Sequence, residues 1–166
     1  EECSFQSSLQ LRILRQTFPI TASGIGMIAK KQIQTGNLSL SVIMPAYNEV
    51  STIQNGIERV LNKKLDGIKI ELILVESNSK DGTKEIVLNY VDHPRVTVII
   101  EDEALGKGHA VRAGLKQATG DFVLIQDADD EYDIEDYDAL IEPLRDGREA
   151  FVLGARHGGG TWKMRA

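Results

Sequence analysis

The sequence of 166 residues is 42% hydrophobic and 27% charged, which excludes a mostly disordered or fibrous chain and fits a single globular domain. The net charge is -6, from 19 Lys and Arg against 25 Asp and Glu, and this acidic balance argues against a nucleic-acid partner. No apolar run approaches the length of a transmembrane helix, and no basic flank followed by an apolar run marks a signal peptide.

The sequence holds one cysteine, Cys3, which has no second cysteine with which to form an internal disulfide. This fits a reducing compartment, so we expect a cytoplasmic protein. The first residue is Glu1 rather than Met, which indicates a processed or excised chain.

Residues 1–38 show no regular pattern of apolar residues. Gly24, Gly26 and Ala29 have the spacing of a dinucleotide-binding loop, but no apolar strand precedes them. We therefore expect a connector or an additional helix here rather than a cofactor loop, and we treat residues 1–38 as an N-terminal extension.

From residue 39 onward, short apolar runs alternate strictly with segments of helical periodicity. The runs are too uniformly apolar for strands with one solvated face, so we predict an α/β fold with a mainly parallel sheet and helices on both faces. We expect Asn48 to cap the first helix. The predicted strands span 40–44, 70–75, 96–100, 122–125 and 151–153, and the predicted helices span 48–61, 81–90, 106–118 and 134–144.

Ligands of such sheets bind beyond the carboxyl ends of the strands, so the residues that follow each strand are candidates for a site. Asp127 and Asp129 follow the fourth predicted strand, where two close carboxylates repel unless a cation lies between them. Mg²⁺ typically pairs one or two carboxylates with substrate phosphates, so these residues are candidate metal ligands. The alternative is a solvated acidic loop that caps the next helix through Asp133.

Tyr47 and Glu49 follow the first predicted strand and offer an aromatic face for a base and a carboxylate for ribose hydroxyls. The same segment also suits the start of a helix, and helix capping does not exclude binding. For Lys107 we weigh a phosphate contact against a solvated position on its helix, whereas Arg156, after the last strand, is placed to contact a diphosphate. No other potential metal ligand lies at a suitable spacing from His109 in the sequence, so we expect His109 to be a surface or capping residue.

Taken together, these segments resemble the family 2 glycosyltransferases, which have the GT-A nucleotide-sugar fold. The metal-binding DxD position of the family falls on Asp127 and Asp129. The glycine run before Trp162 is similar to the branch of the family that loads sugars onto polyprenol phosphates. The resemblance rests on several short motifs in register, at residues 41–49, 79–83, 105–108, 113–115, 118–121, 127–129 and 154–156.

The resemblance implies a Rossmann-like GT-A fold, with residues 39–166 as a partial donor-binding domain that stops before the acceptor half. It implies Mg²⁺ or Mn²⁺ held by Asp127, Asp129 and Glu131, although the polyprenol-phosphate branch often has glutamine at the last position. It implies a UDP- or GDP-linked sugar as donor and a lipid phosphate or a glycan as acceptor, at the inner face of a membrane. The residues implied to contact the nucleotide sugar are Pro45, Tyr47, Glu49, Glu76, Ser77, Asp127, Ala128, Arg156 and Arg165.

The second motif departs from the family pattern. The family usually has two aspartates after this strand, whereas this sequence has Glu76 and Ser77. Because the acid expected to read the base is lost, we expect weak discrimination between uridine and guanosine diphosphates.

The resemblance therefore implies an inverting sugar transfer in which a metal offsets charge on the departing nucleoside diphosphate. The usual position of a catalytic base lies beyond Ala166, and no residue is assigned to that role, since a phosphate acceptor is already ionised. The alternative is a non-catalytic nucleotide-sugar-binding module or a fragment that binds without turnover. A sugar nucleotidyltransferase is disfavoured, because residues 45–47 stand where its phosphate loop is expected.

Overall fold

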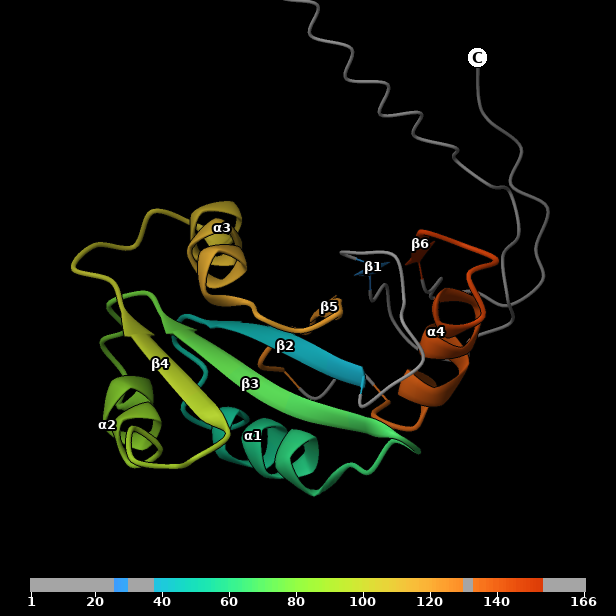
Figure 1. Ribbon diagram of the computed structural model, residues 1–166. Coiled ribbons are helices and arrows are strands. Elements are labelled where there is room, and N and C mark those ends of the chain that lie inside the picture. Colours follow the sequence, from blue (N-terminus) through green and yellow to red (C-terminus); the bar gives the residue numbers. More distant parts are fainter. Residues whose placement is uncertain (1–25, 30–37, 130–132, 154–166) are drawn as a thin grey trace, which may run out of the picture.

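The computed structural model describes residues 26–29, 38–129 and 133–153, which form one sheet with helices packed on both faces (Figure 1). None of the described helices has the length and apolar character needed to cross a lipid bilayer. The strands are β1 (Gly26–Ala29), β2 (Leu38–Ala46), β3 (Ile68–Glu76), β4 (Val96–Ile100), β5 (Phe122–Ile125) and β6 (Phe151–Leu153). The helices are α1 (Ile53–Asn62), α2 (Thr83–Leu88), α3 (Lys107–Gln117) and α4 (Asp136–Arg145).

The order of the strands across the described sheet is β4-β3-β2-β5-β1-β6. β2 pairs in parallel with β3 and with β5, and β3 pairs in parallel with β4. The two longest strands, β2 and β3, have nine residues each and are almost entirely buried, which explains their nearly continuous apolar runs. The prediction of a mainly parallel sheet is confirmed.

Part of the N-terminal extension forms a strand, which the sequence did not predict. β1 lies between β5 and β6 and pairs antiparallel with both of them. The expectation of a connector or an additional helix was therefore wrong for residues 26–29. A strand of four residues is too short to show an alternating pattern, and the partners of β1 lie far along the chain, so no local signal marks it.

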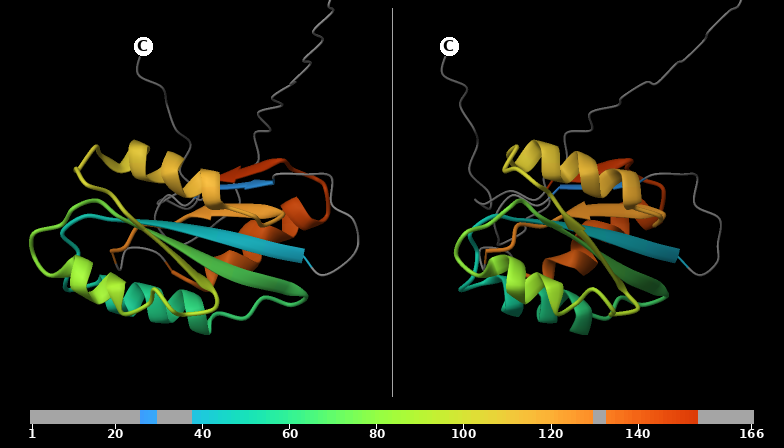
Figure 2. Two further views of the ribbon diagram at one scale, coloured as in Figure 1. Left: turned by 60° about the vertical axis from the view of Figure 1, so that its left-hand side comes forward. Right: turned by 90° about the vertical axis from the view of Figure 1, so that its left-hand side faces the viewer.

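α1, α2 and α4 pack on one face of the sheet, and α3 packs on the other face (Figures 1 and 2). Successive residues of β2 alternate between the two layers. Leu40, Val42 and Met44 belong to the core under α1, α2 and α4, whereas Ile43 belongs to the core under α3. All four side chains are fully buried, so both faces of the central strand are covered, as the sequence predicts.

α3 approaches the sheet closely because it presents a glycine to β2. A Cβ atom on Gly114 would lie 2.5 Å from the Cγ2 atom of Ile43.

Gly114→Ala should therefore lower the free energy of unfolding by about 1–3 kcal/mol, the usual cost of overpacking a core. Gly108→Ala, in the same helix, meets only the end of the Arg112 side chain at 3.7 Å and should raise that free energy by about 0.5–1 kcal/mol. Urea denaturation measures both variants, and equal effects would contradict this packing.

Candidate functional site

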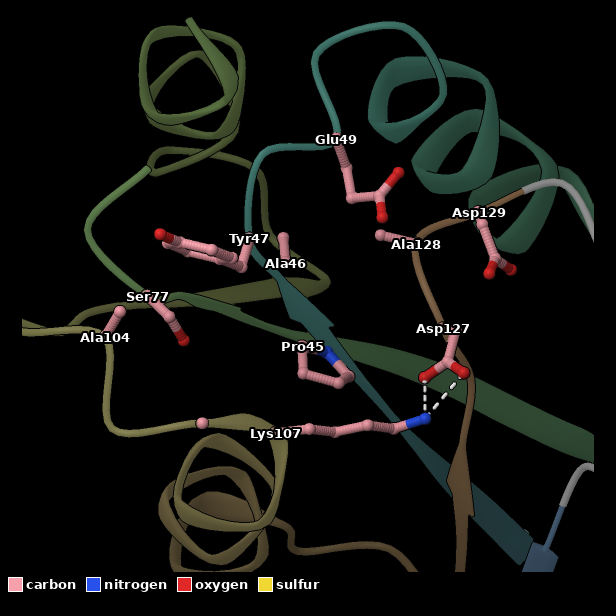
Figure 3. A pocket seen from close by; sticks show the side chains of 11 residues that line it. Pro45, Ala46, Tyr47, Glu49, Ser77, Ala104, Lys107, Asp127, Ala128 and Asp129 are labelled. Carbon is pink, nitrogen blue, oxygen red and sulfur yellow. Dashed lines mark hydrogen bonds and ion pairs between the residues drawn. The ribbon is translucent and has the colours of Figure 1, made fainter. Parts of the chain in front are cut away.

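The loops that follow β2, β3, β4 and β5 surround a cavity at the carboxyl edge of the sheet (Figure 3). Because β2 lies between β3 and β5, the strand order reverses here, and such a switch opens a crevice for ligands. The volume of about 450 Å³ is within the range of small-molecule sites. The cavity is lined by Pro45, Ala46, Tyr47, Glu49, Ser77, Ala104, Gly106, Lys107, Asp127, Ala128 and Asp129.

The loop after β2 is ordered by side chains of the loop after β3. The backbone N–H groups of residues 48–50 donate, in order, to the Ser79 hydroxyl at 3.0 Å, the Thr83 hydroxyl at 2.8 Å and the Asp81 carboxylate at 3.0 Å. The Thr83 hydroxyl in turn donates to Asp81 at 2.6 Å, and this hydrogen bond holds the pKa of the Asp81 carboxyl below its ordinary value. Residues 79–83 thus shape the loop that carries Tyr47 and Glu49.

Asn48 does not cap α1, contrary to the prediction from sequence. Its backbone has a φ of 57°, and its side-chain oxygen accepts a hydrogen bond from the Lys80 N–H at 3.0 Å. α1 begins only at Ile53, with Thr52 in the N-cap position. Asn adopts this left-handed conformation more readily than most residues, so Asn48 serves the turn between β2 and α1 rather than the helix itself.

Tyr47 and Glu49 both reach the cavity, as the sequence predicts for residues after the first buried strand. Tyr47 is 51% exposed, so its ring offers a surface on which a planar group can stack. The Glu49 carboxylate accepts a hydrogen bond from the Thr52 hydroxyl at 2.8 Å, which orients it while it still lines the cavity. The loop therefore presents an aromatic face and an oriented hydrogen-bond acceptor.

The family resemblance implied that Glu76 contacts the nucleotide sugar. Its side chain is fully buried and does not line the cavity. Its two carboxylate oxygens accept hydrogen bonds from the backbone N–H groups of Ser79, at 2.6 Å, and Asn78, at 3.2 Å. Glu76 therefore orders the loop after β3, and it is not among the residues that line the cavity.

Ser77 lines the cavity and is linked to Glu101 and His109, which were not predicted from sequence as part of the site. Its hydroxyl donates to the Glu101 carboxylate at 2.7 Å, and the other oxygen of Glu101 lies 2.6 Å from Nδ1 of His109. Glu101 directly follows β4, so the rule applied to the other strands would have found it. His109 lies in the first turn of α3 and contacts this buried carboxylate, whereas the sequence suggested only a surface or capping residue.

Asp127 and Asp129 follow β5 and line the cavity on either side of the buried Ala128. The two oxygens of Asp127 lie 2.5 and 2.6 Å from the Lys107 ammonium group (Figure 3). Lys107 is the first residue of α3, and its side chain reaches across the cavity to the loop after β5. A positive charge thus already balances one of the two acids, as expected where carboxylates gather.

The oxygen ligands of this pair fit a hard divalent cation such as Mg²⁺ or Mn²⁺. Two carboxylates leave coordination positions for water and for diphosphate oxygens, the usual partners of Mg²⁺ at nucleotide sites. Among the residues that the structure describes, no third acid, histidine or cysteine completes a metal-binding group with them. The predicted third ligand, Glu131, and the predicted phosphate contacts Arg156 and Arg165 lie outside the described residues.

This fold, with its cavity beyond the central strands of a mainly parallel sheet, is the GT-A type of α/β fold. Residues 41–161 match the family model of glycosyl transferase family 2, and the chain belongs to this family. The resemblance that the sequence motifs suggested is confirmed.

Among proteins of known sequence, the chain is similar to a dolichyl-phosphate beta-glucosyltransferase from Trichomonas vaginalis. The two are 33% identical over 128 residues, which cover 70% of this chain and 40% of the relative. The chain therefore spans about two fifths of the length of this relative.

Two solved structures show the same fold. A mannosyltransferase from Pyrobaculum calidifontis, in complex with GDP-Man and Mn²⁺, has 34% sequence identity and a TM-score of 0.51, covering 61% of this chain and 30% of its own. A glucosyl-3-phosphoglycerate synthase from Mycobacterium tuberculosis, in complex with Mn²⁺, uridine-diphosphate and glucosyl-3-phosphoglycerate, has 30% identity and a TM-score of 0.52. That match covers 64% of this chain and 39% of the synthase.

The Thr83 hydroxyl joins the loop after β2 to the loop after β3. Thr83→Val removes this hydroxyl while keeping the shape of the side chain. The Glu49 N–H loses its acceptor and Asp81 loses a donor, at a residue that is fully buried. We expect the free energy of unfolding to fall by about 1–3 kcal/mol, the cost of an unsatisfied buried group. The control Thr97→Val, at an exposed position of β4, should change it by less than about 0.5 kcal/mol. Equal losses in urea denaturation would argue against this link.

Proposed function

We propose that this chain supplies the donor site of an enzyme that transfers a sugar from a nucleoside-diphosphate sugar to an acceptor, with inversion at the sugar carbon. The observation that carries the proposal is that Tyr47, Glu49, Lys107, Asp127 and Asp129 line one cavity. Together they offer a stacking face, a hydroxyl acceptor, a cation and metal ligands, which are the groups that a nucleoside diphosphate needs. Membership of glycosyl transferase family 2 supports this reaction class.

The nucleoside end of the donor belongs at the loop after β2. The exposed Tyr47 ring stacks against the base, and Ser77 faces the edge of the base. The Glu49 carboxylate, oriented by Thr52, accepts hydrogen bonds from the ribose hydroxyls. Pro45, at the end of β2, packs against the sugar-phosphate side of the nucleoside.

The diphosphate belongs between the start of α3 and the loop after β5. Lys107 places its ammonium group in the cavity, and the amino end of α3 adds partial positive charge to the same place. Asp127 and Asp129 would hold Mg²⁺ or Mn²⁺. When bound, that cation would offset the negative charge that develops on the departing nucleoside diphosphate. Both solved relatives named above hold Mn²⁺, which supports the choice of metal.

We propose a lipid phosphate as the acceptor, because the Trichomonas relative is named for dolichyl phosphate. A phosphate oxygen is ionised at neutral pH, so it attacks the sugar carbon without a strong general base. A single in-line attack of this kind inverts the configuration of that carbon. The solved relatives carry GDP-Man or uridine-diphosphate, and both nucleotides fit the proposal.

Removal of one metal ligand should abolish metal-dependent nucleotide binding while leaving the fold intact. Asp129→Ala should lower the affinity for UDP or GDP in the presence of Mn²⁺ by at least about tenfold, since loss of even an outer partner of a metal ligand costs that much. Stability should be unchanged, because Asp129 lies in a loop outside the described core.

Titration calorimetry with and without Mn²⁺ measures this effect. Asp66→Ala is the control, since Asp66 is an exposed acid before β3, at the opposite edge of the sheet. Equal affinities with and without Mn²⁺, in the unaltered chain and in Asp129→Ala alike, would refute the metal site.

Lys107→Met should change metal binding and nucleotide binding in opposite directions. Without the ammonium group on Asp127, Mn²⁺ alone should bind more tightly, because its competitor is gone. Nucleoside diphosphate in the presence of Mn²⁺ should bind more weakly, because a phosphate contact is lost. Electron paramagnetic resonance of free Mn²⁺ measures the affinity for Mn²⁺ alone. Calorimetry measures the affinity for nucleoside diphosphate in the presence of Mn²⁺. Lys116→Met, in the last turn of α3, is the control, and a change of both affinities in one direction would contradict the role of Lys107.

A further inference from the structure

The residues Ser77, Glu101 and His109 form a chain of hydrogen bonds that ends at the wall of the cavity. Ser77 lines the cavity, its hydroxyl contacts Glu101 at 2.7 Å, and Glu101 contacts Nδ1 of His109 at 2.6 Å. The Glu101 side chain is only 7% exposed, whereas that of His109 is 43% exposed. A buried carboxylate is retained only where it is well hydrogen-bonded, and here each oxygen has one partner.

The chemistry of the carboxylate determines the direction of both hydrogen bonds. An ionised carboxylate only accepts, so the Ser77 hydroxyl must donate its proton to Glu101, and His109 must carry its proton on Nδ1. Because its proton is donated to Glu101, the Ser77 oxygen can only accept hydrogen bonds from groups in the cavity. Glu101 therefore makes Ser77 a hydrogen-bond acceptor, whereas a free serine could turn its proton either way.

The contact cannot be a nucleophilic triad. In such a triad a histidine accepts the serine proton, but here the carboxylate stands between Ser77 and His109. The arrangement suits recognition rather than catalysis.

We propose that Glu101 and His109 are positioning residues that set Ser77 as an acceptor for the ring N–H of the donor's nucleobase. The proposal rests on the proposed function, because it takes the base to stack on Tyr47 beside this wall. Uracil and guanine carry such an N–H, at N3 and N1, whereas cytosine and adenine carry a bare nitrogen acceptor at the same place.

The pairs UDP with CDP and GDP with ADP test the proposal, because the members of each pair differ chiefly at that edge of the base. In the presence of Mn²⁺, the unaltered 166-residue chain should bind UDP over CDP, or GDP over ADP, by roughly tenfold, the scale of one hydrogen bond to a group polarised by a charge. Glu101→Gln keeps the shape of the side chain and should reduce that ratio severalfold. His109→Asn, which can still donate to Glu101, should keep more of the ratio than His109→Leu.

A double-mutant cycle with Ser77→Ala separates this role from a structural one. If Glu101 acts through Ser77, Glu101→Gln should leave the ratio unchanged once Ser77 is alanine. Glu103→Gln, an exposed acid of the same loop, is the control for loss of charge and should leave the ratio as it is. An affinity ratio that is unchanged by Glu101→Gln would overturn this proposal. So would a ratio that Glu101→Gln lowers equally with and without the Ser77 hydroxyl. Either result would leave the proposed function standing. Absence of Mn²⁺-dependent binding of any of the four nucleotides would overturn the proposed function, and this proposal with it.

Discussion

The parallel pairing of β2 with both β3 and β5 is the constraint on which the site depends. Toward the amino edge of the sheet, the pairing is held by a polar contact that joins β2 and β3 to the turn before β5. The Glu71 carboxylate accepts hydrogen bonds from the Ser41 hydroxyl at 2.5 Å and from the Thr119 N–H at 2.9 Å, and Ser41 accepts one from the Gly120 N–H at 2.8 Å. Burial raises the pKa of Glu71, but these hydrogen bonds outweigh burial and hold the pKa below its ordinary value.

This contact determines where β5 starts relative to β2. A Cβ atom on Gly120 would lie 2.7 Å from the backbone nitrogen of Ser41, so only glycine allows the approach. The register places Leu40 opposite Phe122 and Ile43 opposite Ile125. β2 and β5 lie side by side and run parallel, so the loops that follow them leave the sheet at the same edge and both line the cavity.

The start of α3 contacts a carboxylate on each of two sides of the same cavity. Lys107 contacts Asp127 on the side assigned to the diphosphate, and His109 contacts Glu101 on the side assigned to the base. Both residues lie in the first turn of one helix, which packs on the sheet through Gly114. A shift of α3 would thus change the surroundings of both carboxylates at once, so the close helix packing and the electrostatics of the site are linked.

Much of this arrangement could be predicted from sequence, for identifiable reasons. The strands at 96–100, 122–125 and 151–153 were predicted with their observed bounds, because each is a short apolar run between polar or turn residues. Tyr47, Glu49, Asp127 and Asp129 were found because they follow buried strands, and the structure brings all four to one cavity.

The errors share a different cause, which is dependence on partners distant in sequence. Asn48 resembles a helix cap, but its side-chain oxygen accepts a hydrogen bond from the backbone N–H of Lys80. β1 pairs with β5 and β6, which lie about 95 and 125 residues further along the chain. Such roles depend on which loops meet in space, and a local pattern carries no information about that.

The most direct test of the account is a crystal structure of the chain grown with UDP or GDP and Mn²⁺, with the ion located by its anomalous scattering. We expect one manganese ion within about 2.0–2.4 Å of carboxylate oxygens of Asp127 or Asp129 and of the diphosphate, a spacing between those of Mg²⁺ and Ca²⁺. We also expect Lys107 to have left Asp127 for a phosphate oxygen. A nucleotide bound in the cavity with the contact between Lys107 and Asp127 intact, and no manganese beside it, would contradict the account.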